Sequence, residues 1–238
     1  MKSNNPHSDP TTEDIVFLLD VDDTLLNNDA IEADLNDHLA HEFGAENRDR
    51  YWSLFEELRD ELGYADYLGA LQRYRLDDLN DPRLLLMSSF LVDYPFADRL
   101  YPMALAVIRH LRRWGQTVIL SDGDAVFQPR KVQRSGLWDA VEGRVLIYIH
   151  KEQRLEAVMH RYPARHYVLV DDKLRILAAV KDILRDRLTT ILPRQGHYAL
   201  DPKSTAKYPA ADITINAIGD LIDYDRSALL GNAAAART

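Results

Sequence analysis

The sequence predicts an α/β protein that has a Rossmann-like, doubly wound parallel sheet and an all-α insert near its start. Short apolar runs alternate with segments of helical length from residue 101 onward, which favours parallel strands joined by right-handed helical crossovers. One earlier apolar run is separated from the others by residues 28–98, whose apolar positions recur at helical spacing. We therefore expect a sheet domain at 12–27 and 99–226, a helical domain at 28–98, and flexible tails at 1–11 and 227–238.

The first expected strand is the apolar run IVFLL at residues 15–19, which follows a polar leader. Five consecutive apolar residues are typical of a strand that is buried on both faces of a parallel sheet. The run is followed at once by the polar sequence Asp20-Val21-Asp22-Asp23-Thr24. This change of character marks the carboxyl end of the strand.

The insert is expected to hold four helices, because its apolar side chains form stripes at spacings of three or four residues. Asp81 followed by Pro82 is typical of the cap and first residue of the fourth helix. The insert is acidic, with 17 Asp and Glu against 6 Arg, and it contains no Lys. The stripes consist of Ile31, Leu35, Leu39 and Phe43, then Tyr51, Phe55, Leu58 and Leu62, then Leu68, Leu71 and Tyr74.

After the insert, helices and strands are expected to alternate. Pro102 should open a helix that ends at Gly115. A strand-like ADITI and a short helix around Leu221 should complete the domain, and the alanine-rich segment after Leu230 should be a frayed tail. The strands between are predicted from the apolar runs TVIL, VLIYI, YVLV and TTIL, at residues 117–120, 145–149, 167–170 and 189–192.

Composition excludes several classes of function. Cysteine is absent, which removes disulfide scaffolds, zinc thiolate sites, iron–sulfur clusters and cysteine nucleophiles, and suits a reducing cytoplasm. No apolar run reaches the roughly 18 residues of a membrane span, and the opening MKSNNPHSDP has no apolar stretch for a secretion signal. The net charge of -9 disfavours binding to nucleic acid or anionic lipid. We expect a cytoplasmic protein without nucleic-acid or membrane partners, and the sequence carries no signal for an oligomeric state.

Polar side chains follow four of the predicted strands. Asp20, Ser121 and Asp171 come directly after three of them, and Lys151 lies just beyond a fourth. In an open parallel sheet, ligands bind in the crevice outside the carboxyl ends of the strands. Turn and cap residues also occur at such positions, but four endings of these types together indicate a functional site.

The residue types at this edge suit a phosphate ester. Asp20 and Asp22 are two residues apart, so they point to the same side while the backbone stays extended; one could attack phosphorus while the other handles a proton. Two unit charges 4 Å apart repel by about 4 kcal/mol at an effective dielectric near 20, so a dianion beside Asp20, Asp171 and Asp172 requires a cation. Hard carboxylate oxygens favour Mg²⁺, Lys151 could add positive charge, and Ser121 could orient the transferring group.

At this point the chain resembles the haloacid dehalogenase superfamily of phosphohydrolases, from Ile15 to about Leu221, most specifically in VFLLDVDDTLL. The resemblance implies that Asp20 is a nucleophile forming an aspartyl-phosphate. It implies that Asp22 protonates the leaving oxygen and then activates water, and that Thr24 orients Asp22. The insert looks like the mobile cap of the family, which closes over the site and sets substrate choice.

By the same resemblance, Ser121 fills the second motif, Lys151 the third, and Asp171 with Asp172 the fourth. The implied metal ligands are the side chain of Asp20, the backbone carbonyl of Asp22 and the late acidic pair, with either Asp171 or Asp172 as the closer ligand. Many relatives carry another acid or Asn just beyond that pair, whereas Lys173 follows here, and Glu152 replaces the common proline after Lys151. Lys131 therefore remains a second candidate for the third motif.

The resemblance covers enzymes of several functions, which the residues of this chain favour to different degrees. Dehalogenases of the superfamily lack the second aspartate of the first motif, so Asp22 argues against carbon–halogen cleavage. Phosphonate hydrolases need a lysine in the cap, and this insert has none. A phosphotransferase or phosphomutase remains open, as does a non-catalytic module that binds a phosphate ligand. The sequence predicts a Mg²⁺-dependent phosphatase that acts on a small phosphorylated metabolite. No G-x-S-x-G, P-loop or G-x-G-x-x-G motif is present.

Other groups of residues have plainer interpretations. His38 and His41 could share a metal, but a solvated helix face is favoured, and His150 is expected only to line the edge of the site. Arg73 and Arg75 could meet an anionic substrate, yet arginines near Asp77 and Asp78 are more often in surface ion pairs. The aromatic residues Tyr51, Trp52 and Phe55 have the spacing of cap packing rather than of base stacking.

Overall fold

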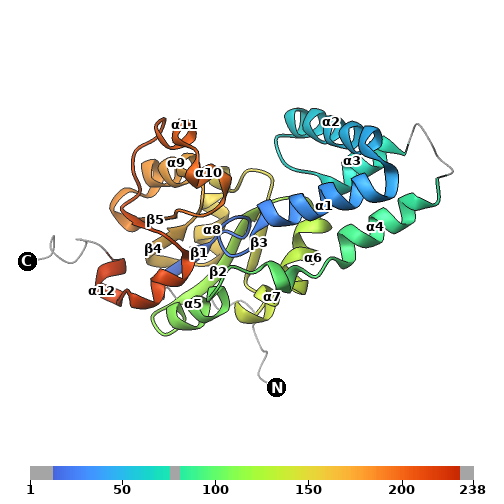
Figure 1. The fold of residues 1–238 in the computed structure, drawn as a ribbon. Helices are drawn as coiled ribbons and strands as arrows, with labels where there is room; N and C mark the ends of the chain where they lie inside the picture. The colour runs from blue at the N-terminus through green and yellow to red at the C-terminus, as the bar shows by residue number, and fades with distance from the viewer. Residues whose placement is uncertain (1–12, 76–80, 231–238) are drawn as a thin grey trace, which may run out of the picture.

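The computed structural model describes residues 13–75 and 81–230, so the predicted leader and alanine-rich tail lie outside the described residues. Six strands form one sheet in the order β3-β2-β1-β4-β5-β6, and every neighbouring pair is parallel (Figure 1). This topology confirms the predicted fold class. The strands are β1 (Glu13–Leu19), β2 (Gln116–Asp122), β3 (Val145–Tyr148), β4 (Ala164–Val170), β5 (Leu188–Pro193) and β6 (Ile213–Ile215).

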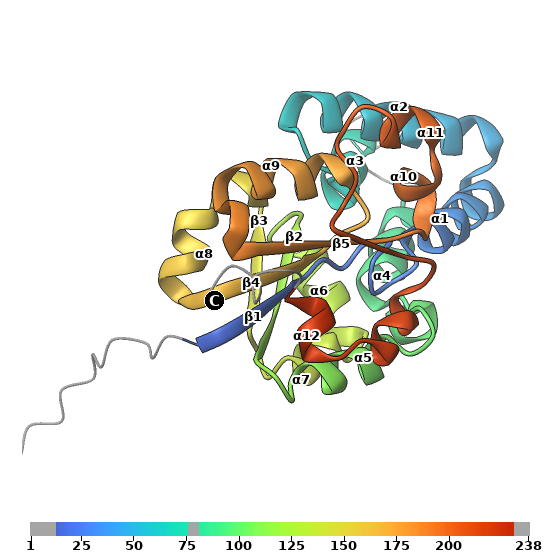
Figure 2. The same ribbon diagram turned by 90° about the vertical axis from the view of Figure 1, so that its left-hand side faces the viewer.

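The sheet is covered by helices on both faces, which makes it doubly wound. Alternate residues of β1 point to opposite faces, so Phe17 belongs to one core cluster and Leu18 to the other. On the Phe17 side lie α5 (Ala104–Leu111), α6 (Phe127–Arg134) and α7 (Leu137–Ala140), and on the Leu18 side lie α8 (Leu155–Arg161) and α9 (Leu174–Leu184) (Figure 2). Because both faces are covered, the central strands each contain an unbroken apolar run, such as residues 15–19 of β1.

The order of the strands reverses direction at β1. The chain fills β2 and β3 on one side of β1 and β4, β5 and β6 on the other, so the crossovers diverge at the carboxyl end of β1. Such a switch point is where ligands bind in open α/β sheets. Asp20 lies just beyond this end, and its backbone N–H donates to the carbonyl of Val170, 3.0 Å away.

The insert is helical, as the sequence predicts, and its four helices lie to one side of the sheet domain (Figure 1). The predicted stripes are buried, apart from Leu62, which is exposed, and Leu68 and Tyr74, which are partly buried. The fourth helix begins at Arg83, one residue after Pro82, and the Asp81 side chain caps it by accepting a hydrogen bond from the Arg83 backbone N–H. The helices are α1 (Asn28–Phe43), α2 (Ala45–Leu62), α3 (Tyr67–Tyr74) and α4 (Arg83–Asp93).

Some boundaries differ from the sequence prediction. The helix after Pro102 starts at Ala104, because Met103 adopts a left-handed conformation. The expected helix around Leu221 is a 3-10 helix, η4 (Ile218–Asp223), followed by α12 (Arg226–Leu229), and another 3-10 helix is η1 (Phe96–Arg99). Two short helices after β5, α10 (Gly196–Leu200) and α11 (Pro202–Thr205), were not predicted. Within the described ranges, no helix has the length and apolar character that crossing a membrane requires.

Candidate active site

The first functional residue follows β1 at the switch point. Asp20 is 3% exposed, and the Nζ of Lys151 donates to its Oδ1 at 2.5 Å. Lys151 opens the 3-10 helix η2 (Lys151–Gln153) after β3, and the same Nζ lies 2.6 Å from Asp171. Burial alone would lower the pKa of Lys151, but Asp171 and Asp20 outweigh it and hold that pKa above its usual value. The structure thus brings Asp20, Lys151 and Asp171 together.

Asp171 and Asp172 follow β4 and are both fully buried. One oxygen each from Asp20, Asp171 and Asp172 lies within 4.8 Å of the others. Among the described residues, neither carboxylate oxygen of Asp172 has a hydrogen-bond partner, and burial raises the pKa of Asp172 well above its usual value. Burying a carboxylate without hydrogen-bond partners costs free energy. A divalent cation bound by these oxygens would offset that cost, and hard carboxylate oxygens are the ligands that such a cation prefers.

The side chain of Asp22 contacts α6, whereas that of Asp20 contacts Lys151 of η2. Its Oδ1 accepts from Lys131 Nζ at 2.7 Å and its Oδ2 from Gln128 Nε2 at 3.2 Å. Gln128 and Lys131 lie three residues apart on α6 and so share one face of that helix. Lys131, the second candidate for the third motif, therefore contacts Asp22, whereas Lys151 contacts Asp20.

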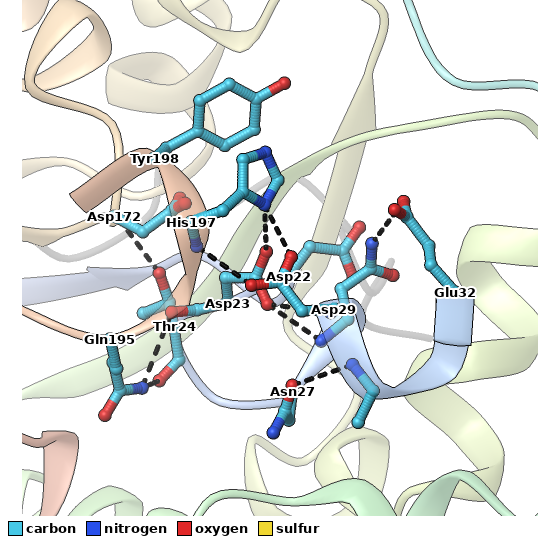
Figure 3. Close-up of polar contacts among 12 residues, drawn as sticks. Asp22, Asp23, Thr24, Asn27, Asp29, Glu32, Asp172, Gln195, His197 and Tyr198 are labelled. Atoms are coloured by element: carbon cyan, nitrogen blue, oxygen red, sulfur yellow. Dashed lines mark hydrogen bonds and ion pairs between the residues drawn. The ribbon is translucent and has the colours of Figure 1, made fainter. Parts of the chain in front are cut away.

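The hydroxyl of Thr24 has hydrogen-bond partners other than Asp22. It donates to Asp20 Oδ2 at 3.5 Å, and it accepts from the backbone N–H of Asp172 at 3.1 Å (Figure 3). The reason is that the chain turns sharply at Asp23, whose φ is 54°, so the turn carries Thr24 back toward β4. Thr24 thus joins the first and fourth motifs.

Ser121 lies at the end of β2, which extends to Asp122, two residues beyond the predicted run. The Ser121 hydroxyl accepts from Gln128 Nε2 at 3.0 Å, so Gln128 links it to Asp22. Asp122 accepts from the backbone N–H of Lys151 at 2.7 Å and thereby fixes the start of η2. Burial raises the pKa of Asp122 to about 6, against the opposing effect of Lys151.

Sequence reasoning missed three of these neighbours, Gln128, Asp122 and Lys173. Lys173 was noted only as a departure from the family pattern, yet Asp172, Asp20 and Asp171 together raise its pKa despite its burial. Its position directly after the acidic pair was the available signal. The signal for Gln128 was weaker. It lies three residues before Lys131 on the helix that follows β2, so the two side chains share one face of that helix.

A second cluster lies beside the first motif. Asp23 is 2% exposed, and its Oδ1 accepts the backbone N–H groups of Asn28 and Asp29, which begin α1. His197 of α10 contacts Asp29 through its backbone N–H at 2.9 Å and its ring Nδ1 at 2.5 Å, and the same Nδ1 lies 3.7 Å from Asp23 (Figure 3). Burial, and then the charges of Asp29 and Asp22, raise the pKa of Asp23 to about 7.

Further contacts join the cap to the sheet domain near this cluster. Arg59 of α2 donates to the hydroxyl of Tyr198 on α10 at 3.1 Å. A Cβ placed on Gly63 would come within 2.9 Å of the His150 ring, so that ring packs directly on the end of α2. His150 therefore lines the site, as expected, and contacts the cap.

A cavity of about 700 Å³ lies between the cap and the carboxyl ends of the strands. Such a volume suits a small molecule. Its floor includes Asp22, Asp122 and Lys173, and its cap wall holds both aromatic and polar side chains. The cap residues that line it are Asn28, Glu32, Asn36, Trp52, Phe55, Glu56, Arg59, Gly63, Tyr64, Ala65 and Tyr67.

The remaining sequence candidates have packing or surface contacts of their own. His38 stacks on Phe90 with ring centroids 4.0 Å apart, while His41 is exposed beside Glu42, so the two do not form a metal pair. Arg73 pairs with Glu61 on the cap surface, and Asp77 and Asp78 lie outside the described residues. The aromatic cluster packs inside the cap, with Tyr51 and Phe55 both in edge-to-face contact with Trp52.

Known proteins resemble this chain in sequence and in fold. A protein of Burkholderia xenovorans LB400 described as a haloacid dehalogenase-like hydrolase is 68% identical, with a TM-score of 0.85, and the match covers 90% of this chain and 99% of that one. The L-2-haloacid dehalogenase of Xanthobacter autotrophicus shares the fold at 19% identity and a TM-score of 0.55, covering 90% and 98%.

A Bacillus subtilis hydrolase described as bound to magnesium shares the fold at 15% identity and a TM-score of 0.58, covering 90% and 98%. No curated protein matches the sequence. The family model of haloacid dehalogenase-like hydrolases matches residues 16–183, which span the first motif, the cap and the late acidic pair. The chain therefore belongs to the haloacid dehalogenase-like hydrolases.

Proposed function

We propose that this hydrolase is a Mg²⁺-dependent phosphatase that cleaves a small phosphate monoester through an aspartyl-phosphate. One observation carries the proposal: Asp20, Asp171 and Asp172 converge, and neither oxygen of Asp172 is hydrogen-bonded to any described residue. A divalent cation held by Asp20, the Asp22 backbone carbonyl and the acidic pair would neutralise the cluster and polarise a phosphate oxygen. Mg²⁺ suits this set because every donor is a hard oxygen.

Two contacts of Asp20 support its role as the nucleophile. Lys151 fixes one of its oxygens and Thr24 contacts the other, so the carboxylate can present one lone pair to phosphorus. In the first step, an Asp20 oxygen forms a bond to phosphorus while the bond to the alcohol oxygen breaks. In the second step, water attacks the same phosphorus, its proton leaves, and the Asp20–phosphorus bond breaks to restore the carboxylate.

Asp22 supplies the proton chemistry. As the acid form it gives its proton to the departing alcohol oxygen, and the resulting carboxylate then takes a proton from the attacking water. Lys131 and Gln128 each contact one oxygen of Asp22, which limits rotation of the carboxyl group. Ser121, tied to the same Gln128, lies where its hydroxyl could orient the phosphoryl oxygens.

Asp22 favours phosphate over a carbon–halogen bond. A halide leaves without needing a proton, so an acid beside the nucleophile has no task in dehalogenation. The L-2-haloacid dehalogenases among the similar structures are 18–20% identical to this chain and share only its fold. The Bacillus subtilis hydrolase is described as bound to magnesium and as showing interdomain movement, which agrees with a metal-dependent site beneath a moving cap.

A substrate screen tests the proposal. p-Nitrophenyl phosphate and a panel of metabolite phosphates are assayed with Mg²⁺ and with EDTA, beside 2-chloropropionate with halide detection. We expect phosphate release that needs Mg²⁺, and a loss of at least about 10⁴-fold in Asp20→Asn, because a neutral amide is a poor nucleophile. Hydrolysis at the parental rate by Asp20→Asn, or halide release in place of phosphate release, would overturn the proposal. Transfer of the phosphoryl group to a second hydroxyl would instead identify a phosphotransferase.

A further inference from the structure

The cap wall of the cavity contains one carboxylate that differs from the others. Glu32, on the second turn of α1, is half-buried, and its Oε1 accepts from the Tyr67 hydroxyl at 2.6 Å and from Asn28 Nδ2 at 3.0 Å. Across residues 13–75 and 81–230, no Lys, Arg or His forms an ion pair with it. Because both of its contacts come from neutral donors, its negative charge has no direct counter-ion.

Several other charged groups in or beside the cavity are already paired. Glu56, the other cap glutamate in the wall, pairs with Arg59 at 3.2 Å. Arg175 pairs with Glu152 at 2.6 Å, and Lys131 contacts Asp22 and Asn28. Glu32 is therefore the cap carboxylate that would gain most from a cation brought in by a ligand.

Aromatic rings surround the same part of the wall. Phe55 packs on Tyr67 with ring centroids 4.8 Å apart and on Trp52 at 5.3 Å, and all three line the cavity with Glu32. Aromatic faces attract ammonium groups, most strongly where water is excluded. A lone carboxylate beside three rings matches a positively charged group better than a neutral hydroxyl.

A short chain of hydrogen bonds connects Glu32 with the reacting end of the cavity. Asn28 donates to Glu32 through Nδ2, and its Oδ1 accepts from Lys131 Nζ at 2.9 Å, which in turn contacts Asp22. Glu32 and Asp22 thus line the same cavity and are linked through two intervening side chains.

We propose that Glu32 binds an ammonium group on the alcohol half of the substrate, so that the substrate class is the phosphate monoester of an amino alcohol. This inference rests on the proposed phosphatase function. Tyr67 and Asn28 hold the carboxylate, the rings of Trp52 and Phe55 exclude water beside it, and the ammonium group supplies the missing counter-charge.

Matched esters test the inference. ω-Aminoalkyl phosphates with two to five carbons are compared with ω-hydroxyalkyl and n-alkyl phosphates of equal length, in Mg²⁺. At the best chain length we expect kcat/KM for the ammonium ester to exceed that of either neutral ester by about tenfold or more. Glu32→Gln should bring the ammonium ester down to the n-alkyl value, whereas the matched control Glu56→Gln should keep the preference.

The outcomes separate the two proposals. If no ester releases phosphate, the proposed function fails. If the esters are cleaved with equal kcat/KM, if the hydroxyl ester is preferred, or if Glu32→Gln keeps the preference, the phosphatase stands and the inference about Glu32 is overturned. Should Glu32→Gln not fold, competition assays on the parental enzyme decide: alkylammonium ions should inhibit hydrolysis at lower concentration than alcohols of equal length, and equal inhibition would overturn the inference.

Discussion

Two clusters at the first motif consist mainly of aspartates, but they differ in whether their carboxylates already have hydrogen-bond donors. Asp20, Asp171 and Asp172 form one, and Asp23, Asp29 and His197 form the other, each with ligand atoms within 4.8 Å of one another. In the first, both oxygens of Asp172 lack any hydrogen-bond partner among the described residues. In the second, Asp23 and Asp29 accept backbone and ring N–H groups from α1 and α10.

The difference shows that proximity of acids does not define a metal site. Carboxylates whose oxygens already accept protein donors have little to gain from a cation, whereas a buried carboxylate without donors gains the whole interaction. The first cluster is therefore the candidate cation site. The second joins the sheet domain to the cap, because α1 belongs to the cap and α10 to the sheet domain.

The largest expected effect separates the clusters by metal binding. Mg²⁺ at 100 times its Kd should stabilise the parental protein by about 2.7 kcal/mol, measured as a rise in Tm. Asp172→Asn should abolish both this rise and phosphate release, because it removes the ligand without hydrogen bonds. Asp29→Asn, the matched change in the second cluster, should retain the rise. A Tm response to Mg²⁺ lost in Asp29→Asn and kept in Asp172→Asn would reverse the comparison.

The next effect concerns the ammonium group of Lys151, the protein's own positive charge within the first cluster. Lys151→Met leaves Asp20 and Asp171 without their buried counter-ion, so we expect a loss of about 3–5 kcal/mol in the free energy of unfolding, measured by urea denaturation without metal. Added Mg²⁺ should recover part of that loss by supplying charge to the same carboxylates. A stability equal to that of the parental protein would show that the two aspartates do not depend on Lys151.

A smaller effect probes how closely α10 packs on the first motif. A Cβ at Gly196 would lie 2.3 Å from the Cβ of Asp23, and Gly196 has a φ of 76°. Gly136 has a φ of 83° but nothing within 4 Å of its added Cβ, so Gly136→Ala measures backbone strain alone, about 1 kcal/mol. Gly196→Ala should cost more than that and should lower kcat. Equal costs in urea denaturation would mean that α10 yields without disturbing Asp23.

The smallest expected effect is that of the histidine in the second cluster. The His197 side chain is 51% exposed, so its loss in His197→Ala should lower stability by less than about 1 kcal/mol. Because it joins α10 to α1, we expect KM to rise several-fold while kcat changes little, since the cap would close less often over the substrate. Steady-state kinetics check this split, and a fall in kcat with KM unchanged would contradict it.

Part of the candidate site could be predicted from the sequence because the strands are local and parallel. Residues that follow such strands meet at one edge whatever the helices do, which is why Asp20, Ser121, Lys151 and Asp171 could be placed together. Thr24 could not be placed, because its hydroxyl depends on the turn at Asp23. Lys131 could not be assigned, because the approach of α6 to Asp22 depends on how the helices pack between strands far apart in the chain.

The sequence by itself determined the fold class, the helical insert and the chemistry available at the edge of the sheet, since apolar periodicity and residue type are local properties. Only the tertiary structure decided which charges are paired. The carboxylate of Asp172 remains without a hydrogen-bond partner, Asp29 is held by His197 of α10, and Glu32 faces the cavity without a counter-ion among the described residues. The donors that reach Asp29 and Glu32 come from segments far away in the chain, so their presence depends on how those segments pack.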